Sequence, residues 1–327
     1  MLWRILKWLV SIIVVVVGGG LAFLALRPVN MRAAPAMTVE RTPERVARGK
    51  HLFGVCGCIA CHSALDETRF GFPPLENGLA KGRSIPELPG TIAAPNLTSD
   101  PETGAARYTD GQLIRAIREG IGHDDRVLFP MMPYSEYRAM SDEDVQSVVA
   151  YIRTLPPIRN PLPPSKVMFP VNLFIKSLPQ TVESVPSVDR SNPQKYGEYI
   201  TKVNGCYFCH TPFEKNELIT GKALSGGHVF EIGKDARVVT ANLTPDTETG
   251  LGKWTEQQFL DKFAEYKDYA ANGPPKIDLP HNTVMPWLQL SATPAEDLKA
   301  IFAYLRSVPA IHNAVVTHPD APEATKK

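Results

Sequence analysis

The chain has 327 residues, enough for two ordinary domains and a short appendage. Its 35 basic and 34 acidic residues give a net charge of +1, without the basic excess typical of nucleic-acid-binding proteins, so we expect no nucleic-acid partner. Five cysteines are too few, and odd in number, for a disulfide scaffold, whereas 43% apolar residues suffice for packed cores.

The N-terminal segment has the length and composition of a membrane anchor. Residues 8–26 (WLVSIIVVVVGGGLAFLAL) carry no charge, and as a helix rising about 1.5 Å per residue they nearly cross a bilayer core of about 30 Å. A cleaved secretory signal is the alternative, because Ala34-Pro35-Ala36 offers a cleavage site. We expect residues 1–30 to be an uncleaved anchor and the rest of the chain to be exported.

Two sequence blocks in the first half recur in the second half. ARGKHLFGVCGCIACH (47–62) matches KYGEYITKVNGCYFCH (195–210). NLTSDPETGAARYTDGQL (96–113) then matches NLTPDTETGLGKWTEQQF (242–259). Self-similarity in the same order along the chain indicates an internal duplication.

A third block completes the repeat. MPYSEYRAMSDEDVQSVVAYIRTLPPIRN (132–160) matches MPWLQLSATPAEDLKAIFAYLRSVPAIHN (285–313), after an insertion of about seven residues that we place within YKDYAANGPPKIDLPHN. We therefore expect two copies of one domain. The expected segments are the anchor 1–30, domain one 40–160, a linker 161–187, domain two 188–313 and a tail 314–327.

Each copy reads as mostly helical. TDGQ (109–112) and TEQQ (255–258) predict capping boxes, in which the threonine hydroxyl accepts from the backbone N–H three residues on. SDED (141–144) and TPAE (293–296) predict that a second helix starts in a similar way, with Pro294 in its first turn. Core-facing residues follow at helical spacing, namely Val145, Val148, Val149, Ile152, Leu298, Ile301, Phe302 and Leu305.

The linker is rich in proline but contains large apolar side chains. These are Met168, Phe169, Leu173, Phe174 and Ile175. A free linker would not need them, so we expect the linker to pack on the domains and to hold them in a fixed orientation.

The sequence Cys-x-x-Cys-His occurs once in each copy. Two thiols three positions apart followed by an imidazole suit covalent haem, because each thiol adds across one vinyl group and the histidine reaches the iron. We predict that one haem c is attached at each motif. The predicted residues are Cys58, Cys61, Cys206 and Cys209 for covalent attachment, and His62 and His210 as axial iron ligands.

A zinc site and a thioredoxin-like redox pair are the alternative interpretations of these motifs. Zinc ribbons usually place their cysteine pairs about 15 to 20 residues apart, whereas Cys58 and Cys206 are 206 − 58 = 148 residues apart. Zinc also gives no reason for a histidine at the same place in both motifs. A redox pair would sit in a βαβ context, which the sequence lacks, so the pattern favours haem.

The sixth iron ligand has a candidate in each copy. Met132 and Met285 occupy matching positions, and each precedes a proline that favours an extended backbone. A methionine is more often core filler than ligand, but the repeat selects one per copy, and a thioether stabilises reduced iron. We predict these two as distal ligands; Met131 is the main alternative in the first copy.

Several other residues have less specific roles. Asn96 and Asn242 lie in matching turns, and we expect them to form the turn more than to contact haem. Tyr108 and Trp254 align, and either a bond to a haem propionate or packing at a helix entry explains them. Cys56 aligns with no sulfur, and we expect a buried free thiol, with an intermolecular disulfide as the alternative.

With these features the chain resembles class I c-type cytochromes, and more closely the membrane-bound cytochrome c subunits of periplasmic dehydrogenases for alcohols, gluconate, aldehydes and nicotinate. The resemblance rests on CIACH, NLTSDPETGAARYTDGQLIRAIREGI, LFPMMPY and MSDEDVQSVVAYIRTLPP, and covers the first copy almost entirely and the second in part. It implies a mostly α fold of two tandem class I cytochrome c domains behind an N-terminal transmembrane helix. It also implies the covalent, proximal and distal roles assigned above.

The chain departs from that family in three respects. The subunits in question carry three haems and this chain has two motifs, its anchor is N-terminal, and its second ligand loop is longer. That loop reads LPHNTVMPW, so His281 is an alternative to Met285 as distal ligand. In the family, haem is attached outside the cytoplasmic membrane. The resemblance therefore implies a single-pass protein of the bacterial inner membrane with its haem domains in the periplasm.

Two classes of function fit this sequence. A carrier with both irons capped by methionine would pass electrons from a periplasmic dehydrogenase or other donor to a respiratory acceptor, such as a cytochrome or terminal oxidase. A di-haem peroxidase or a thiosulfate dehydrogenase-like enzyme would instead need one open or exchangeable iron, and the insertion at His281 keeps that reading open. We favour the electron carrier, which is not itself an enzyme.

Overall fold

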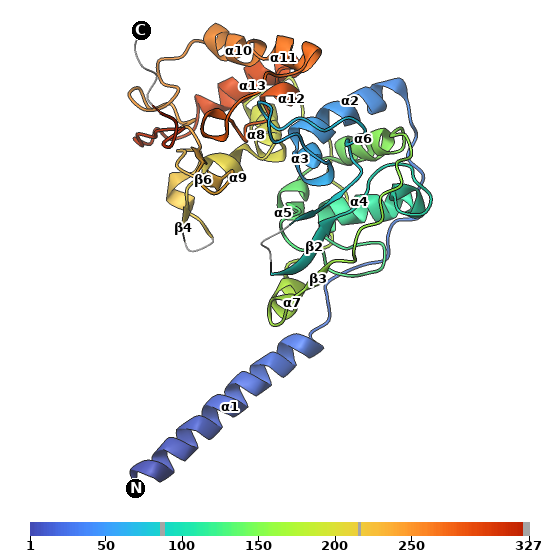
Figure 1. Ribbon diagram of the computed structural model, residues 1–327, viewed down its shortest axis with the longest axis vertical. Coiled ribbons are helices and arrows are strands. Elements are labelled where there is room, and N and C mark those ends of the chain that lie inside the picture. Colours follow the sequence, from blue (N-terminus) through green and yellow to red (C-terminus); the bar gives the residue numbers. More distant parts are fainter. Residues whose placement is uncertain (86–88, 215–216, 323–327) are drawn as a thin grey trace.

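The computed structural model describes residues 1–85, 89–214 and 217–322, and the chain is mostly helical, as the sequence predicts. Residues 323–327 of the expected tail lie outside the described residues. Helix α1 (Leu2–Leu26) projects from the body that the rest of the chain forms (Figure 1). Its span Trp3–Leu26 has a mean hydropathy of 2.8 and is not buried by the body, so it is long and apolar enough to cross a membrane.

The two halves of the body contain helices in matching order. The first half has α2 (Pro43–Val55), α3 (Cys58–His62), η1 (Ala105–Arg107), α4 (Asp110–Glu119), α5 (Tyr134–Tyr137) and α6 (Asp142–Ile152). The second half has α8 (Pro193–Val203), α9 (Cys206–His210), η3 (Thr220–Lys222), α10 (Glu256–Ala264), α11 (Lys267–Asn272), η4 (Leu279–His281), α12 (Trp287–Leu290) and α13 (Ala295–Leu305). The linker contributes α7 (Val171–Phe174) and η2 (Ile175–Ser177).

Short antiparallel strands occupy the long loops. In the first half, β1 (Arg83–Ile85) pairs with β2 (Gly90–Ala94), which pairs with the linker strand β3 (Lys166–Val167). In the second half, β4 (Phe213–Glu214) pairs with β5 (Glu217–Leu218), and β6 (Val229–Glu231) pairs with β7 (Arg237–Val239). The sheet of the first half thus ties the linker to the loop that follows the first Cys-x-x-Cys-His motif.

A glycine lets the two long helices of each half touch backbone to backbone. A Cβ at Gly49 of α2 would lie 1.8 Å from the carbonyl oxygen of Ser147 in α6. A Cβ at Gly197 of α8 would lie 1.9 Å from the carbonyl oxygen of Ala300 in α13. Real side chains do not tolerate such contacts, so the same close crossing is built into both halves.

The predicted helix signals are confirmed with one exception. Thr109 and Thr255 both form complete capping boxes, and the Ser141 side chain accepts from the backbone N–H of Asp144. The predicted cap at Thr293 is wrong, because extended Pro294 itself is the N-cap of α13 and the Thr293 hydroxyl has no hydrogen-bond partner. The apolar residues predicted to face the core from α6 and α13 are all buried.

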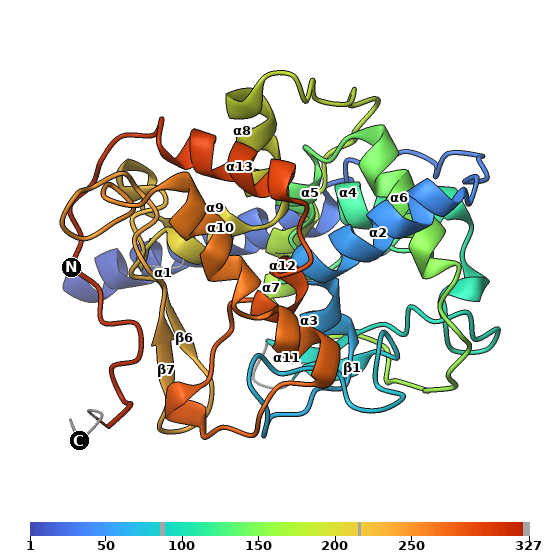
Figure 2. The same ribbon diagram turned by 90° about the horizontal axis from the view of Figure 1, so that it is seen from above.

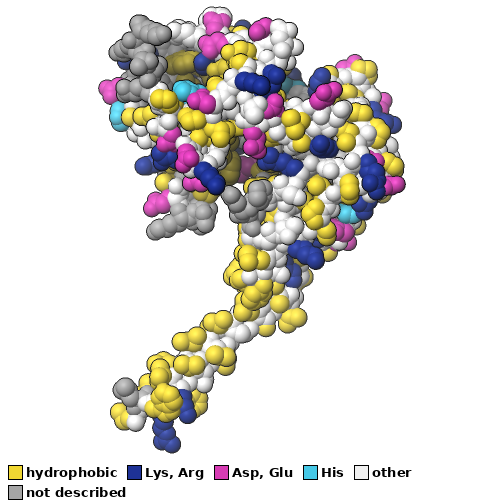
Figure 3. Space-filling view, in the orientation of Figure 1, with side chains coloured by type: hydrophobic (Ala, Val, Ile, Leu, Met, Phe, Trp, Pro, Cys, Tyr) yellow, Lys and Arg dark blue, Asp and Glu magenta, His cyan; other side chains and the backbone are white. Residues whose placement is uncertain are grey.

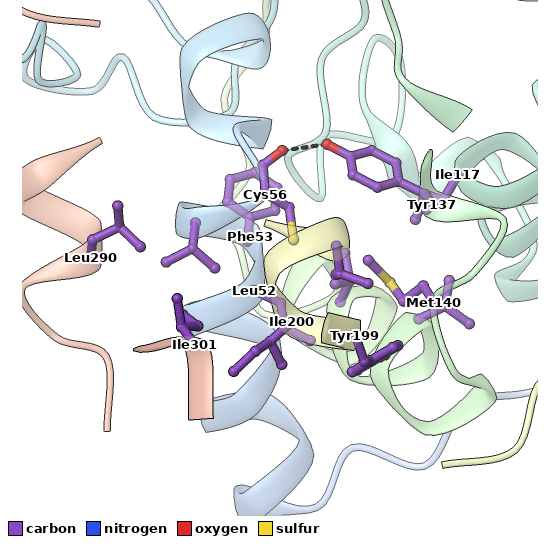
Figure 4. Packing of buried hydrophobic residues seen from close by; sticks show 14 of the residues in the cluster. Leu52, Phe53, Cys56, Ile117, Tyr137, Met140, Tyr199, Ile200, Leu290 and Ile301 are labelled. Carbon is purple, nitrogen blue, oxygen red and sulfur yellow. Dashed lines mark hydrogen bonds between the residues drawn. The ribbon is translucent and has the colours of Figure 1, made fainter. Parts of the chain in front are cut away.

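One hydrophobic core runs through both halves. Leu52 and Cys56 from the end of α2 lie in the same apolar cluster as Tyr199 and Ile200 of α8 (Figure 4). Helix α12 packs against α2 at this boundary (Figure 2). The halves are therefore joined by buried apolar surface as well as by the linker.

A buried charged network crosses the same boundary. Arg48 of α2 donates to Asp144 of α6 (2.9 Å) and to Asp297 of α13 (3.1 Å). Two tyrosines of α8 complete the network, because Tyr199 donates to Asp144 (2.7 Å) and Tyr196 to Asp297 (3.0 Å). The two carboxylates occupy equivalent places in their halves, and one arginine holds both.

The insertion in the second half reaches across to the first. The backbone N–H of Phe70 donates to the Pro275 carbonyl (3.0 Å), and the Asn282 side chain accepts from Gly71 (2.8 Å). Phe70 also stacks on Tyr266, with ring centroids 5.4 Å apart. The extra residues thus form part of the contact between the halves.

The linker packs differently from the sequence-based expectation. Ile175 is buried and Leu173 is half-buried, as expected. Met168, Phe169 and Phe174, in contrast, are exposed, so the prediction that they pack on the domains is wrong. Helix α7 lies beside the end of α1 (Figure 1).

Candidate haem sites

Each Cys-x-x-Cys-His motif forms one short helix, and a glycine with a left-handed backbone conformation precedes it. Gly57 (φ 81°) precedes α3, and Gly205 (φ 73°) precedes α9. The positive φ turns the chain sharply after α2 and α8, a conformation that glycine adopts without strain. Residues three apart in a helix lie on the same side, so each short helix presents its two thiols together.

The four motif cysteines are free thiols in an apolar setting. Burial raises the pKa of Cys58 and of Cys206 to about 12, and that of Cys209 to about 11. Burial raises the pKa of Cys61 as well. Redox-active Cys-x-x-Cys pairs have a lowered thiol pKa, so these surroundings do not match the thioredoxin-like alternative.

Both motif histidines are held in the same orientation. Nδ1 of His62 lies 2.8 Å from the Pro95 carbonyl oxygen, and Nδ1 of His210 lies 2.8 Å from that of Ala241. A carbonyl only accepts, so Nδ1 carries the proton and Nε2 keeps its lone pair. Burial lowers the pKa of both imidazoles, which keeps them neutral and able to bind a metal through Nε2.

The two carbonyls that orient these rings stand directly before the repeated asparagines. Asn96 and Asn242 each accept from the backbone N–H two residues on, at 2.9 Å. Their amide nitrogens donate to the carbonyls of Ile158 (2.7 Å) and Ile311 (2.8 Å), just beyond the last helix of each half. They form turns, as predicted, and the turns fix the carbonyls that face the histidines.

A cavity of about 600 Å³ opens beside the first motif. Cys58, Cys61, His62 and Met132 all line it. The other lining residues are mostly apolar and include Leu97, Leu113, Ile117, Val127, Leu128 and Val148. The volume is typical of small-molecule and cofactor sites, and two thiols, an imidazole and a thioether converge on it, so the residues present fit a covalently held haem.

Met131 and Met132 both line this cavity but differ in exposure. The Met131 side chain is 40% exposed, whereas Met132 is half-buried and packs against the core. The backbone of Met132 is held from both sides, by the Phe129 carbonyl (3.1 Å) and the Tyr134 N–H (2.8 Å). Of the two, Met132 is the more fixed.

In the second half, Met285 and His281 lie in different surroundings. Met285 is half-buried, packs against the core, and donates its N–H to the Thr283 hydroxyl (3.0 Å). His281 is exposed in η4, and its Nδ1 lies 2.7 Å from a carboxylate oxygen of Asp278. Met285 therefore packs against the core, whereas His281 forms a surface ion pair.

The aligned residues Tyr108 and Trp254 have different surroundings. Tyr108 lines the cavity of the first half and packs on His123, with ring centroids 4.3 Å apart. Trp254 is exposed. The predicted equivalence of these two residues is therefore one of sequence position and not of surroundings.

Tyr137 and Cys56 lie where the two motifs approach each other. The Tyr137 hydroxyl donates to the backbone carbonyl of Cys56 (Figure 4). Burial raises the pKa of Tyr137, and the thiols of Cys58 and, from the other motif, Cys209 raise it further. The Cys56 thiol is buried and free, as predicted.

Sequence reasoning missed Tyr137 because the repeat gave no signal for it. Its aligned position in the second half holds Leu290, which is buried in the same core. No spacing between a tyrosine and a cysteine motif in the sequence predicts that the two lie close together in the fold. Its position follows from how the halves pack, which the sequence pattern does not encode.

The described residues do not form a zinc site. In residues 1–85, 89–214 and 217–322, no three histidine, cysteine or acidic side chains are grouped as metal ligands. Zinc sites of the structural type need four such ligands in a tetrahedron. One histidine and one thioether facing a cavity are instead the donor set of a low-spin haem iron.

Known proteins resemble this chain over most of its length. A family model described as cytochrome c matches residues 46–156. The fructose dehydrogenase cytochrome subunit of Gluconobacter japonicus is 31% identical over 301 residues, covering 88% of this chain and 58% of the relative. The alcohol dehydrogenase (quinone) cytochrome c subunit of Gluconobacter oxydans is 28% identical over 308 residues, covering 89% and 60%.

A relative of similar length also matches. A diheme cytochrome c-type protein of Cereibacter sphaeroides is 30% identical over 310 residues, covering 91% of this chain and 96% of the relative. The chain spans only about three fifths of the dehydrogenase subunits. On the cysteine motif, the oriented histidine, the cavity and these likenesses, the chain belongs to the cytochrome c family.

Proposed function

We propose that the chain is a membrane-anchored di-haem cytochrome c built from two tandem class I domains, residues 40–160 and 188–313. The linker 161–187 would join them and the tail 314–327 would follow. Each domain would hold one haem c. The proposed residues are Cys58, Cys61, Cys206 and Cys209 for covalent attachment, with His62 and Met132, and His210 and Met285, as axial ligands.

The observation that carries this proposal is the repetition of one site geometry. Both halves have a left-handed glycine before the motif and a histidine whose Nδ1 is 2.8 Å from a backbone carbonyl. Unrelated cysteine pairs would have no reason to share these details. The full-length match to a diheme cytochrome supports a count of two.

The residues present define how such a site would work. A bound haem supplies a one-electron centre. Burial keeps each imidazole neutral, and the backbone carbonyl that accepts from Nδ1 holds the ring with Nε2 free. The apolar walls of the first cavity exclude water. A methionine on the opposite side would leave no open position for a substrate, which suits a carrier better than the peroxidase-like or thiosulfate dehydrogenase-like alternative.

The donor and acceptor are inferred from the relatives. Because similar chains are cytochrome subunits of fructose and alcohol dehydrogenases, we infer that a periplasmic dehydrogenase supplies the electrons. A respiratory cytochrome or terminal oxidase would accept them. Helix α1 would span the bacterial inner membrane once, with the N-terminus inside and both haem domains in the periplasm.

Redox titration of the full-length protein in detergent tests the carrier proposal. We expect two one-electron waves, methionine-type six-coordinate spectra from both haems, and no binding of carbon monoxide to the reduced protein at neutral pH. Carbon monoxide or peroxide binding by one haem would favour the enzyme instead. A single wave that accounts for only one haem would contradict the two-domain proposal.

A further inference from the structure

The linker exposes an unusual run of large apolar side chains. Met168, Phe169, Phe174 and Leu178, here called the linker patch, are between 40% and 64% exposed. Four such residues within eleven positions are more than the scattered exposed apolar residues of an ordinary surface. Neither half of the body covers them.

The linker patch lies beside the membrane end of α1. Helix α7 contacts α1, and Nζ of Lys176 donates to the Ala25 carbonyl in its last turn (2.7 Å). Figure 1 places α7 at the end of the body from which α1 leaves, and Figure 3 shows hydrophobic side chains continuing from α1 onto that end. The patch is thus continuous with the most apolar surface of the protein.

The charged residues of the linker segment that carries the patch are basic. Residues 161–182 contain no aspartate or glutamate, and their two charged residues are Lys166 and Lys176. Arg27 follows α1 directly, and the guanidinium of Arg138 donates to the Leu178 carbonyl (3.0 Å). Exposed aromatic and aliphatic side chains framed by basic groups match the interfacial layer of a bilayer with anionic lipid headgroups.

We propose that the linker patch inserts into the interfacial layer of the lipid bilayer, as a second membrane contact beside α1. This inference rests on the proposed anchor. The basic side chains lie at headgroup level, where exposed Lys166 extends toward lipid phosphates while its stem covers apolar surface, and Lys176 stays on the Ala25 carbonyl. The membrane would then cover the apolar side chains of the linker patch, which neither half of the body covers.

This placement has a consequence for the first haem site. Val167, Asn172, Ile175 and Lys176 line the cavity beside Cys58. One wall of that cavity is therefore the inner side of the segment whose outer side carries the linker patch. The first half becomes the one whose haem pocket borders the membrane surface, which fixes the orientation of the whole body above the bilayer.

Photo-crosslinking of the full-length protein in nanodiscs of phosphatidylethanolamine and phosphatidylglycerol tests the inference. p-Benzoylphenylalanine replaces Phe169 or Phe174 in separate variants, a change that keeps an exposed aromatic ring. The control replaces Trp254, an exposed aromatic before α10 at the end of the body away from α1 (Figure 1). A further variant at Phe23 of α1 reports on the anchor itself.

After irradiation, intact-mass spectrometry counts lipid adducts. We expect lipid adducts at positions 23, 169 and 174, with several-fold higher yield at 169 and 174 than at 254. Adducts at 23 without excess at 169 and 174 would overturn the linker-patch inference and leave the anchor standing. Crosslinks from 169 or 174 to a protein chain would overturn it as well. Absence of adducts at 23 would instead contradict the anchor.

Discussion

At the residue scale, the account depends on what faces each motif histidine. His62 is fixed by the Pro95 carbonyl, and its cavity contains Met132, which packs against the core from a loop held at both sides. Met131, its neighbour, lines the same cavity from a more exposed position. Replacing each methionine in turn by histidine would show which of the two is the distal iron ligand.

The Met132→His variant should keep its haem but lower that haem's reduction potential. Attachment through Cys58 and Cys61 does not involve Met132, so the cofactor stays bound. A second imidazole favours ferric iron more than a thioether does, and we expect a fall of about 0.1 V or more within the roughly 0.8 V that axial ligands span. Spectroelectrochemical titration measures it.

Met131→His is the matched control and should leave both potentials close to those of the native protein. A potential unchanged in Met132→His, or lowered only in Met131→His, would show that Met132 is not the ligand.

The cysteines, histidines and methionines proposed for both sites could be chosen from the sequence because the duplication marks them twice. Tyr137 and Cys56 differ in this respect. Leu290 replaces the tyrosine in the second half, and no other sulfur aligns with Cys56. Neither residue has a counterpart of its own kind in the second copy, so the repeat could not identify them.

At the element scale, the two helix crossings decide how each half closes. Gly49 and Gly197 allow contact at distances that no Cβ tolerates. The sequence alignment paired these glycines but did not explain them, because a helical glycine has many possible reasons. The predicted helix cap at Thr109 is confirmed, because its own segment supplies both partners of the capping box. The predicted cap at Thr293 is wrong, because Pro294 is the N-cap of α13.

Gly49→Ala and Gly197→Ala should each destabilise the protein by about 1–3 kcal/mol, because the added methyl forces apart the crossing helices. The sign is informative, since alanine is otherwise better than glycine in a helix by about 0.5–1 kcal/mol. Urea denaturation followed by circular dichroism measures the free energy of unfolding.

Lys50→Ala, at an exposed position of the same helix, is the control and should change the stability little. If Gly49→Ala were as stable as the native chain or more so, the close crossing of α2 and α6 would be contradicted.

At the scale of the whole molecule, Arg48 holds the halves together through two carboxylates. Burial alone would raise the pKa of Asp144, but the hydrogen bonds and charge of Arg48, with a further bond from Tyr199, lower it below its usual value. Arg48→Met leaves Asp144 and Asp297 buried without their cation. We expect a loss of about 3–5 kcal/mol, measured by urea denaturation at pH 7.

Arg45→Met removes a neighbouring ion pair from the surface, that of Arg45 with Glu143, and should cost less than about 1 kcal/mol. Equal losses in the two variants would contradict a buried network.

The loss in Arg48→Met should also depend on pH in a defined direction. A lowered carboxyl pKa contributes stability above the unfolded value of about 3.9, and that stability disappears as pH falls through the lower folded value. Without Arg48 the pKa of Asp144 rises, so protonation relieves the buried charge in the variant first. The stability difference between native protein and variant should therefore be largest at pH 7 and narrow toward pH 4.

The arrangement of the halves was outside the reach of the sequence. Arg48 aligns with Tyr196, so the bridge has no counterpart, and the insertion near Pro275 gave no sign that it contacts Phe70. Helices, caps and the cysteine motifs follow from local patterns, whereas these contacts depend on Arg48 and on the insertion, which only one copy has.

The most direct test of the whole account is the intact mass of the chain expressed in a bacterium that attaches haem to exported proteins. We predict the added mass of two haem groups, retained after acid-acetone extraction, and lost one at a time in Cys58→Ala/Cys61→Ala and in Cys206→Ala/Cys209→Ala. A native chain that carries no covalent haem, or haem on only one motif, would contradict it.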